Sequence, residues 1–143
     1  MVNVSKNALA KEMRTHLRKE LVDLFIANTT KRDFGKLLFE LLSPAERIML
    51  EKRAGIIGLL SCDYSAYEIS QLLKVSTSTI WHIEERLDAG HYAHIQQIFH
   101  KKRARASVLH FLGSIMALGF PGVASAQLRS KIRRDAEAFR AGG

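Results

Sequence analysis

Apolar residues recur at every third or fourth position along most of the chain, which is the spacing of one face of an α-helix. Between residues 5 and 27 the repeating positions are Leu9, Met13, Leu17, Leu21, Leu24 and Phe25. The other positions of this segment are largely charged, so it is predicted to form an amphipathic helix that buries one stripe against another helix, in the same chain or in a second one. A short apolar helix is predicted next, from Thr30 as its cap to Leu42.

The clearest helix start in the sequence is at Ser43. Serine is a favoured N-cap, Pro44 suits the first helical position, and Glu46 completes a capping box. This helix is predicted to end near Ser61. Gly55 and Gly58 lie inside it, where each costs about 1 kcal/mol relative to alanine, and close packing of a neighbouring helix is favoured over a ligand pocket as the reason.

The stretch from Ser65 to Gly90 has the spacing of two short helices joined by a tight turn. Its inward-facing apolar positions are Ile69, Leu73, Val75, Ile80, Ile83 and Leu87. Ser65 and Ser76 stand where the two helices should begin, and Gly90 can end the second helix in a left-handed conformation. This is the pattern of a helix-turn-helix.

The outward positions at the start of the second helix carry hydroxyl groups and flat rings that can reach base edges. They are Ser76, Thr77, Ser78, Trp81 and His82. One hydroxyl must cap the helix, and Thr79, beside Ile80, is expected to be partly buried, so Thr77 and Ser78 are the best base-reading candidates. Trp81 is expected to be exposed rather than packed against a neighbouring helix, because Ile80 and Ile83 occupy the inner face. For His82 a base or phosphate contact and a solvated position both remain open.

Four further residues are candidates for phosphate contacts, which fix the register on a duplex without reading its sequence. They are Tyr67 on the first helix, Lys74 in the turn, and Lys52 and Arg53 near the end of the preceding helix. Helix-turn-helix proteins usually carry glycine at the position of Lys74. A lysine in the left-handed conformation costs of order 1 kcal/mol.

The chain beyond Gly90 is predicted to form a helix over residues 91–102, followed by the basic run Lys101–Arg105, for which phosphate contact and a solvated face are equally open. Residues 106–128 carry no acidic or basic side chain apart from His110, which raises the question of a membrane span. Glycine, serine and proline dilute this segment, so a helical hairpin of residues 107–118 and 123–140, joined at Gly119–Gly122, is favoured over insertion.

Composition and charge narrow the function. The chain has 143 residues, with 22 Lys and Arg against 14 Asp and Glu, and a formal net charge of +8. Such a balance favours a polyanionic partner, nucleic acid first and an anionic membrane surface second. Cys62 is the single cysteine, so a reducing cytoplasmic location is expected, and no Cys/His spacing suggests a metal site. The charged N-terminus is interpreted as neither signal peptide nor anchor, and no arrangement of residues suggests an enzyme.

From Leu37 to Leu87 the sequence resembles the Trp repressor superfamily and its Trp-repressor-like members. The resemblance rests on LLSPAER, YEISQLL and VSTSTIWHI, and covers roughly a third of the chain. It implies an all-helical homodimer whose protomers interlock through their N-terminal and C-terminal helices. Each protomer presents a helix-turn-helix to successive major grooves, and the half-site spacing of about 34–36 Å is taken over with the resemblance.

The same resemblance bears on the effector. In the family two arginines and a glycine near the recognition helix build a tryptophan pocket, and Arg53 matches the first arginine. His82 stands at the second arginine and Ile83 at the glycine. A β-branched side chain would fill the pocket, and histidine is a poorer partner for a carboxylate than a guanidinium. Tryptophan is therefore not expected as a corepressor, and no cofactor is predicted.

The sequence thus predicts an all-α protein with three regions: an N-terminal dimerisation helix (residues 1–30), a Trp-repressor-like helix-turn-helix core (31–103) and a basic C-terminal helical extension (104–143). The predicted function is sequence-specific binding of double-stranded DNA by a homodimer that regulates transcription, as a repressor. The alternative is a protein-interaction or membrane-associated helical module without sequence-specific DNA binding.

Overall fold

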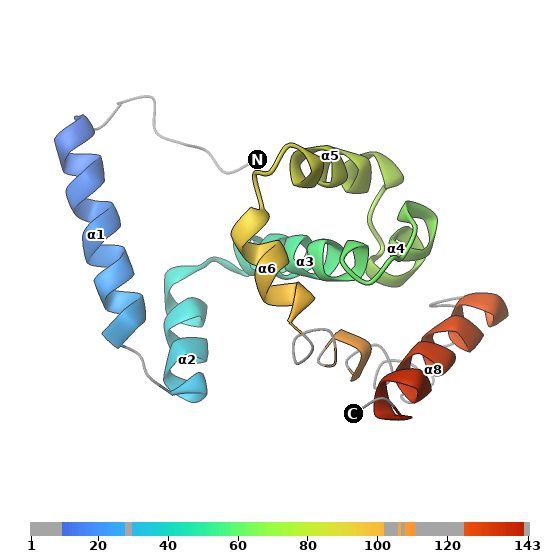
Figure 1. The fold of residues 1–143 in the computed structure, drawn as a ribbon. Helices are drawn as coiled ribbons and strands as arrows, with labels where there is room; N and C mark the ends of the chain where they lie inside the picture. Colours follow the sequence, from blue (N-terminus) through green and yellow to red (C-terminus); the bar gives the residue numbers. More distant parts are fainter. Residues whose placement is uncertain (1–9, 28–29, 102–105, 107, 111–124, 142–143) are drawn as a thin grey trace. The chain divides into compact units, whose positions relative to one another are not determined.

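The computed structural model of the chain describes residues 10–27, 30–101, 106, 108–110 and 125–141. Within these ranges every regular element is an α-helix (Figure 1). The helices are α1 (Lys11–Ala27), α2 (Lys31–Leu41), α3 (Pro44–Leu60), α4 (Ala66–Leu73), α5 (Thr77–Asp88), α6 (Ala93–His100) and α8 (Ala126–Ala141). The predicted all-α class is confirmed. The helices form two compact units, unit 1 (Met1–Leu50) and unit 2 (Glu51–Gly143), with the boundary inside α3.

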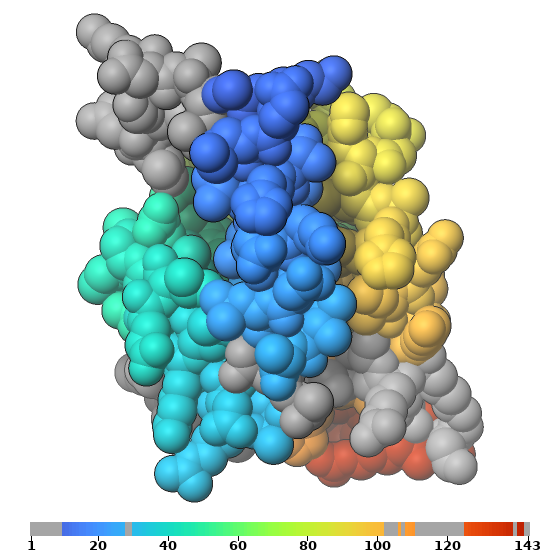
Figure 2. All heavy atoms as spheres, turned by 90° about the vertical axis from the view of Figure 1, so that its left-hand side faces the viewer, coloured from blue at the N-terminus to red at the C-terminus, as the bar shows by residue number. Residues whose placement is uncertain are grey.

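Unit 1 has a largely uncovered apolar surface. No residue of α1 or α2 is buried, and on the face shown in Figure 2 α1 is visible along its whole length. The two helices contact each other through the rings of Phe25 and Phe34, whose centroids are 5.7 Å apart. Apolar side chains that a helix pair of this kind would ordinarily bury therefore remain accessible to solvent.

Unit 2 contains the hydrophobic core. Figure 1 shows α4, α5 and α6 arranged around α3, whose four consecutive residues 56–59 are all buried. The core side chains are Ile56, Ile57, Leu59, Cys62, Tyr64, Ile69, Ile80, Ile83, Leu87, Leu109, Leu128 and Ile132. The inward-facing residues predicted for both short helices are thus in the core or, as with Leu73 and Val75, packed against it.

The predicted helix caps Thr30, Ser43 and Ser65 are confirmed, because each forms a capping hydrogen bond with the residue three positions later. Thr30 Oγ1 accepts from the backbone N–H of Asp33 at 3.1 Å. Ser43 and Glu46 form the expected reciprocal capping pair before α3, with the Ser43 N–H donating to Glu46 Oε2 at 2.9 Å. Ser65 and Glu68 form a full capping box before α4.

The two glycines inside α3 allow the close packing that the sequence predicts. A Cβ on Gly55 would lie 3.2 Å from Cδ1 of Leu73. A Cβ on Gly58 would lie 3.1 Å from the ring of Phe99 and 3.2 Å from Cγ2 of Val108. These positions bring α4 on one side and α6 on another close to the backbone of α3.

The last helix, α8, makes polar contacts with the start of α4 and with Tyr64, which precedes that helix. Lys131 Nζ donates to both carboxylate oxygens of Glu68 at 3.0 Å and lies 4.5 Å from the centre of the Tyr64 ring. The Tyr64 hydroxyl donates to Asp135 Oδ2 at 2.9 Å. Because Leu128 and Ile132 of the same helix are buried, α8 is part of the core of unit 2.

The carboxylate of Glu68 therefore has two structural partners, and its ionisation is expected to stabilise unit 2. Burial alone would raise the pKa of Glu68, but hydrogen bonds from Ser65 and Lys131 outweigh it and lower the pKa below its usual 4.5. A lowered pKa means that the stabilisation is present at neutral pH and is lost as the pH falls through the folded-state pKa. We expect Glu68→Gln to lower the melting temperature at pH 7 and to flatten its fall between pH 6 and pH 3, measured by circular dichroism.

The matched control is Glu137→Gln on α8, an exposed glutamate whose side chain makes no hydrogen bond or ion pair with the described residues. This variant is expected to retain the wild-type melting temperature and its pH dependence. Equal behaviour of the two variants would contradict the role assigned to Glu68.

Parts of the sequence predictions lie outside the described residues. These are residues 5–9 of the first helix, residues 102–105 of the basic run, and the GFPG join of the C-terminal hairpin with most of the 107–118 helix. The second arm of the hairpin, predicted over 123–140, is observed as α8, and the helix predicted over 91–102 is observed as α6. Among the described helices, none has the length and apolar character needed to cross a membrane.

Candidate nucleic-acid interface

The helices α4 and α5 pack against each other and are joined by only three residues, Lys74, Val75 and Ser76. Ile69 of α4 and Ile80 of α5 are completely buried in the shared core, which fixes how far each helix can rotate. The side chains on the opposite face of α5 must therefore point away from the core, since an α-helix advances about 100° per residue.

The turn between the two helices depends on a backbone position that non-glycine residues adopt rarely. Lys74 has φ 51° and ψ 53°, the left-handed conformation expected at this place. Its carbonyl accepts a hydrogen bond from Lys52 Nζ at 3.3 Å. Lys52 is half-buried and lies in the middle of α3 rather than near its end. Its amine therefore supports the turn through this hydrogen bond.

Ser76 caps α5, and its hydroxyl group lies within hydrogen-bond distance of two neighbouring hydroxyl groups. Its Oγ accepts from the backbone N–H of Thr79 at 3.3 Å and lies 3.0 Å from Ser78 Oγ and 2.8 Å from Thr79 Oγ1. The expectation that Thr79 is partly buried is wrong, because its side chain is exposed and reaches back to the cap. Thr77 is half-buried, whereas Ser78 is exposed.

The outer face of α5, defined here as Ser78, Trp81, His82 and Glu85, follows the three- and four-residue spacing of a single helix face. All four residues are exposed, and 58% of the Trp81 surface is accessible. The side chains of Trp81, His82 and Glu85 form no hydrogen bond, ion pair or ring contact with the described residues. Indole, imidazole and carboxylate groups on this face are thus available to a partner.

Glu85 is a member of this face that the sequence interpretation missed. Its spacing from Trp81 is four residues and from Ser78 seven, so the helical period that placed Trp81 outward also places Glu85 outward. Glu85 lies more than two turns beyond the N-terminus of α5, outside the first turns where base-contacting residues of a helix-turn-helix usually lie.

Three of the four predicted phosphate contacts are accessible, namely Tyr67, Lys74 and Arg53. Tyr67, in the first turn of α4, is 67% exposed, and Arg53 is exposed on α3. The first turn of α5 contains no acidic residue, so the positive end of its helix dipole is not neutralised locally. A phosphate group near the start of α5 would therefore meet backbone N–H groups and a favourable dipole.

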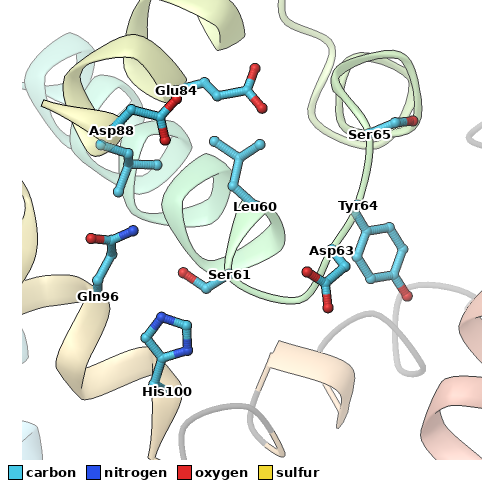
Figure 3. Close-up of a pocket in the computed structure, with 10 residues that line it drawn as sticks. Leu60, Ser61, Asp63, Tyr64, Ser65, Glu84, Asp88, Gln96 and His100 are labelled. Carbon is cyan, nitrogen blue, oxygen red and sulfur yellow. The ribbon is translucent and has the colours of Figure 1, made fainter.

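A pocket of about 370 Å³ lies at the C-terminal ends of α3 and α5 and along α6 (Figure 3). Its lining includes the carboxylates of Asp63, Glu84 and Asp88 together with His100. Arg53 does not line it, and Ile83 is buried in the core with 7% of its surface exposed. The carboxylate of a tryptophan corepressor would therefore meet like charges in this pocket.

Comparisons of the chain with protein-family models, with curated proteins and with solved structures find no match.

Proposed function

We propose that this chain is a sequence-specific regulator of transcription, acting as a repressor, that binds double-stranded DNA as a homodimer. In this proposal α4 and α5 form a helix-turn-helix of the Trp-repressor-like kind, and α5 enters the major groove. The observation that carries the proposal is the outer face of α5. A tryptophan that is 58% exposed stands there beside an exposed serine and histidine, and buried isoleucines on the opposite side hold the face outward.

The contacts around this face support a division between positioning and reading. Tyr67, Lys74 and Arg53 would contact phosphates, because they are exposed cationic or hydroxyl-bearing side chains on the elements that precede α5. Ser78, Trp81 and His82 would contact base edges, with Thr77 at the rim. Ser76 serves the fold, since its hydroxyl accepts the capping hydrogen bond, and Lys52 supports the turn.

Unit 1 supports the homodimer. Large apolar side chains of α1 are exposed along one stripe, including Met13, Leu17, Leu21 and Leu24 at 42 to 51%. A second copy of the chain offers the same stripe, so two α1 helices can bury these residues against each other or against another helix of the partner. Exposed apolar area of this extent on a charged chain favours a protein contact over solvent.

Selection of duplexes from a random pool tests the proposal. We expect enrichment of a palindromic consensus, because two identical half-sites require a symmetric operator. Lys74 and Arg53 of two protomers supply four cationic contacts, for which affinity is expected to fall about 100-fold between about 50 and 200 mM salt. Absence of enrichment combined with a steep salt dependence would leave only non-specific binding and would contradict the proposed function.

Two single substitutions separate reading from positioning in the same assay. Thr77→Ala is expected to relax the base preference at one symmetric position while retaining most of the affinity. Lys74→Ala is expected to weaken binding to all sequences alike and to lower the salt dependence. Sedimentation with anionic lipid vesicles in place of duplex binding would support the alternative of a membrane-associated module.

A further inference from the structure

Glu85 carries the one acidic side chain on the outer face of α5, whose other members are Ser78, Trp81 and His82. It is exposed, and its carboxylate has no partner among the described residues. Trp81 lies four residues before Glu85 and Ser78 lies seven residues before it, so the three side chains share one face of the helix. A carboxylate in this position is unfavourable near phosphates unless it receives a hydrogen bond, since both groups are negatively charged.

Among the base edges in the major groove, the exocyclic amines of cytosine and adenine are donors. Guanine presents two acceptors and thymine an acceptor and a methyl group. Cytosine offers only its N4 amine, whereas adenine places the N7 acceptor beside its N6 amine, which repels a carboxylate. A carboxylate therefore selects cytosine and penalises the other bases, because it would be left desolvated and unpaired against them.

We infer that Glu85 reads the N4 amine of a cytosine in each half-site and so determines one position of the target sequence. The inference rests on the proposed function, because it needs α5 in the major groove. From Thr77 to Glu85 the helix axis rises about 12 Å, similar to the roughly 12 Å width of the major groove. The cytosine is thus read at the far end of the contact, beyond the bases reached by Ser78 and Trp81.

Selection of duplexes from a random pool, performed with the full-length chain and two substitutions, tests this inference. Wild type is expected to enrich cytosine at one symmetric pair of positions. Glu85→Gln is expected to change that base to adenine, because a glutamine amide pairs with both N6 and N7 of adenine. Glu85→Ala is expected to reduce the preference at the same position at least tenfold and leave the other positions unchanged.

Glu84→Gln is the matched control. Glu84 is also exposed, and its substitution changes the net charge by the same amount as Glu85→Gln. Its side chain lines the pocket shown in Figure 3 instead of the outer face of α5. Its consensus is expected to match that of wild type. The inference is overturned, while the proposed function stands, in either of two cases. In the first, Glu85→Gln and Glu85→Ala select the same consensus as wild type. In the second, these variants gain affinity equally for all sequences. Failure of wild type to enrich any sequence would instead contradict the proposed function itself.

Discussion

Replacing Trp81 by alanine is expected to weaken binding to the preferred duplex by at least tenfold and to leave the folded protein intact. The indole is 58% exposed and has no partner among the described residues, so its removal opens no cavity in the core. In the proposed complex its apolar surface would cover a thymine methyl group and exclude water from the groove. Loss of such an aromatic anchor costs about 2 kcal/mol at an interface, or about 30-fold in affinity.

The chain contains a single tryptophan, which provides a direct measurement. In the free protein its fluorescence is expected to be that of a solvated indole and readily quenched by acrylamide. Bound duplex is expected to protect it. Anisotropy of a labelled duplex gives the affinity, and a melting curve checks the fold.

Trp81→Phe is the control for this prediction, because a phenyl ring retains much of the apolar contact. It is expected to bind more tightly than Trp81→Ala. Wild-type affinity in the alanine variant, or quenching that bound duplex does not change, would exclude Trp81 from the interface.

Introducing charge into the apolar stripe of α1 is expected to abolish the proposed homodimer. Leu17 and Leu21 lie one turn apart and are 49% and 42% exposed, so each has unburied area to give to a partner. Leu17→Glu combined with Leu21→Glu would place two carboxylates in the dimer contact, where they would be desolvated without a partner. We expect a monomer in sedimentation equilibrium and at least a 100-fold loss of affinity for a palindromic duplex, since only one half-site is then bound.

A charge-matched variant controls for electrostatic effects. Thr15→Glu combined with Lys19→Gln changes the net charge by the same amount on the polar side of α1, where both residues are exposed. This variant is expected to remain a dimer. If wild type itself sediments as a monomer, or if the leucine variant remains dimeric, α1 is not the dimer contact.

The features predicted correctly from the sequence are those decided by neighbouring residues. The sequence predicts Ser43, Ser65 and Ser76 as helix caps because a cap and its donor are three residues apart, and each forms the expected hydrogen bond. The inward placement of Ile80, Ile83 and Leu87 follows from the helical period alone. The outward placement of Trp81 follows from the same period.

Contacts between residues distant in sequence could not be predicted in this way. The contact between Lys131 and Glu68 joins residues 63 positions apart, and no periodicity encodes it. The positive charge of Lys52 predicts a phosphate contact, whereas its hydrogen bond to the carbonyl of Lys74 depends on how α3 meets α4. The resemblance to the Trp repressor superfamily, the helix-turn-helix and the interlocked dimer stay predictions, as do the boundaries at residues 30 and 103.

The side chains of Trp81, His82 and Glu85 are exposed and form no hydrogen bond, ion pair or ring contact with the described residues, which has an evolutionary consequence. Substitutions at these three positions leave the core and the caps untouched, so in the proposed complex they would alter target choice with little effect on folding. Ser76 is constrained in the opposite way, because only a side chain that caps α5 can replace it without loss of stability. In the proposed DNA-binding regulator, a duplicated copy of this chain would therefore acquire a new operator through changes at a few surface residues, while the scaffold that presents them is inherited intact.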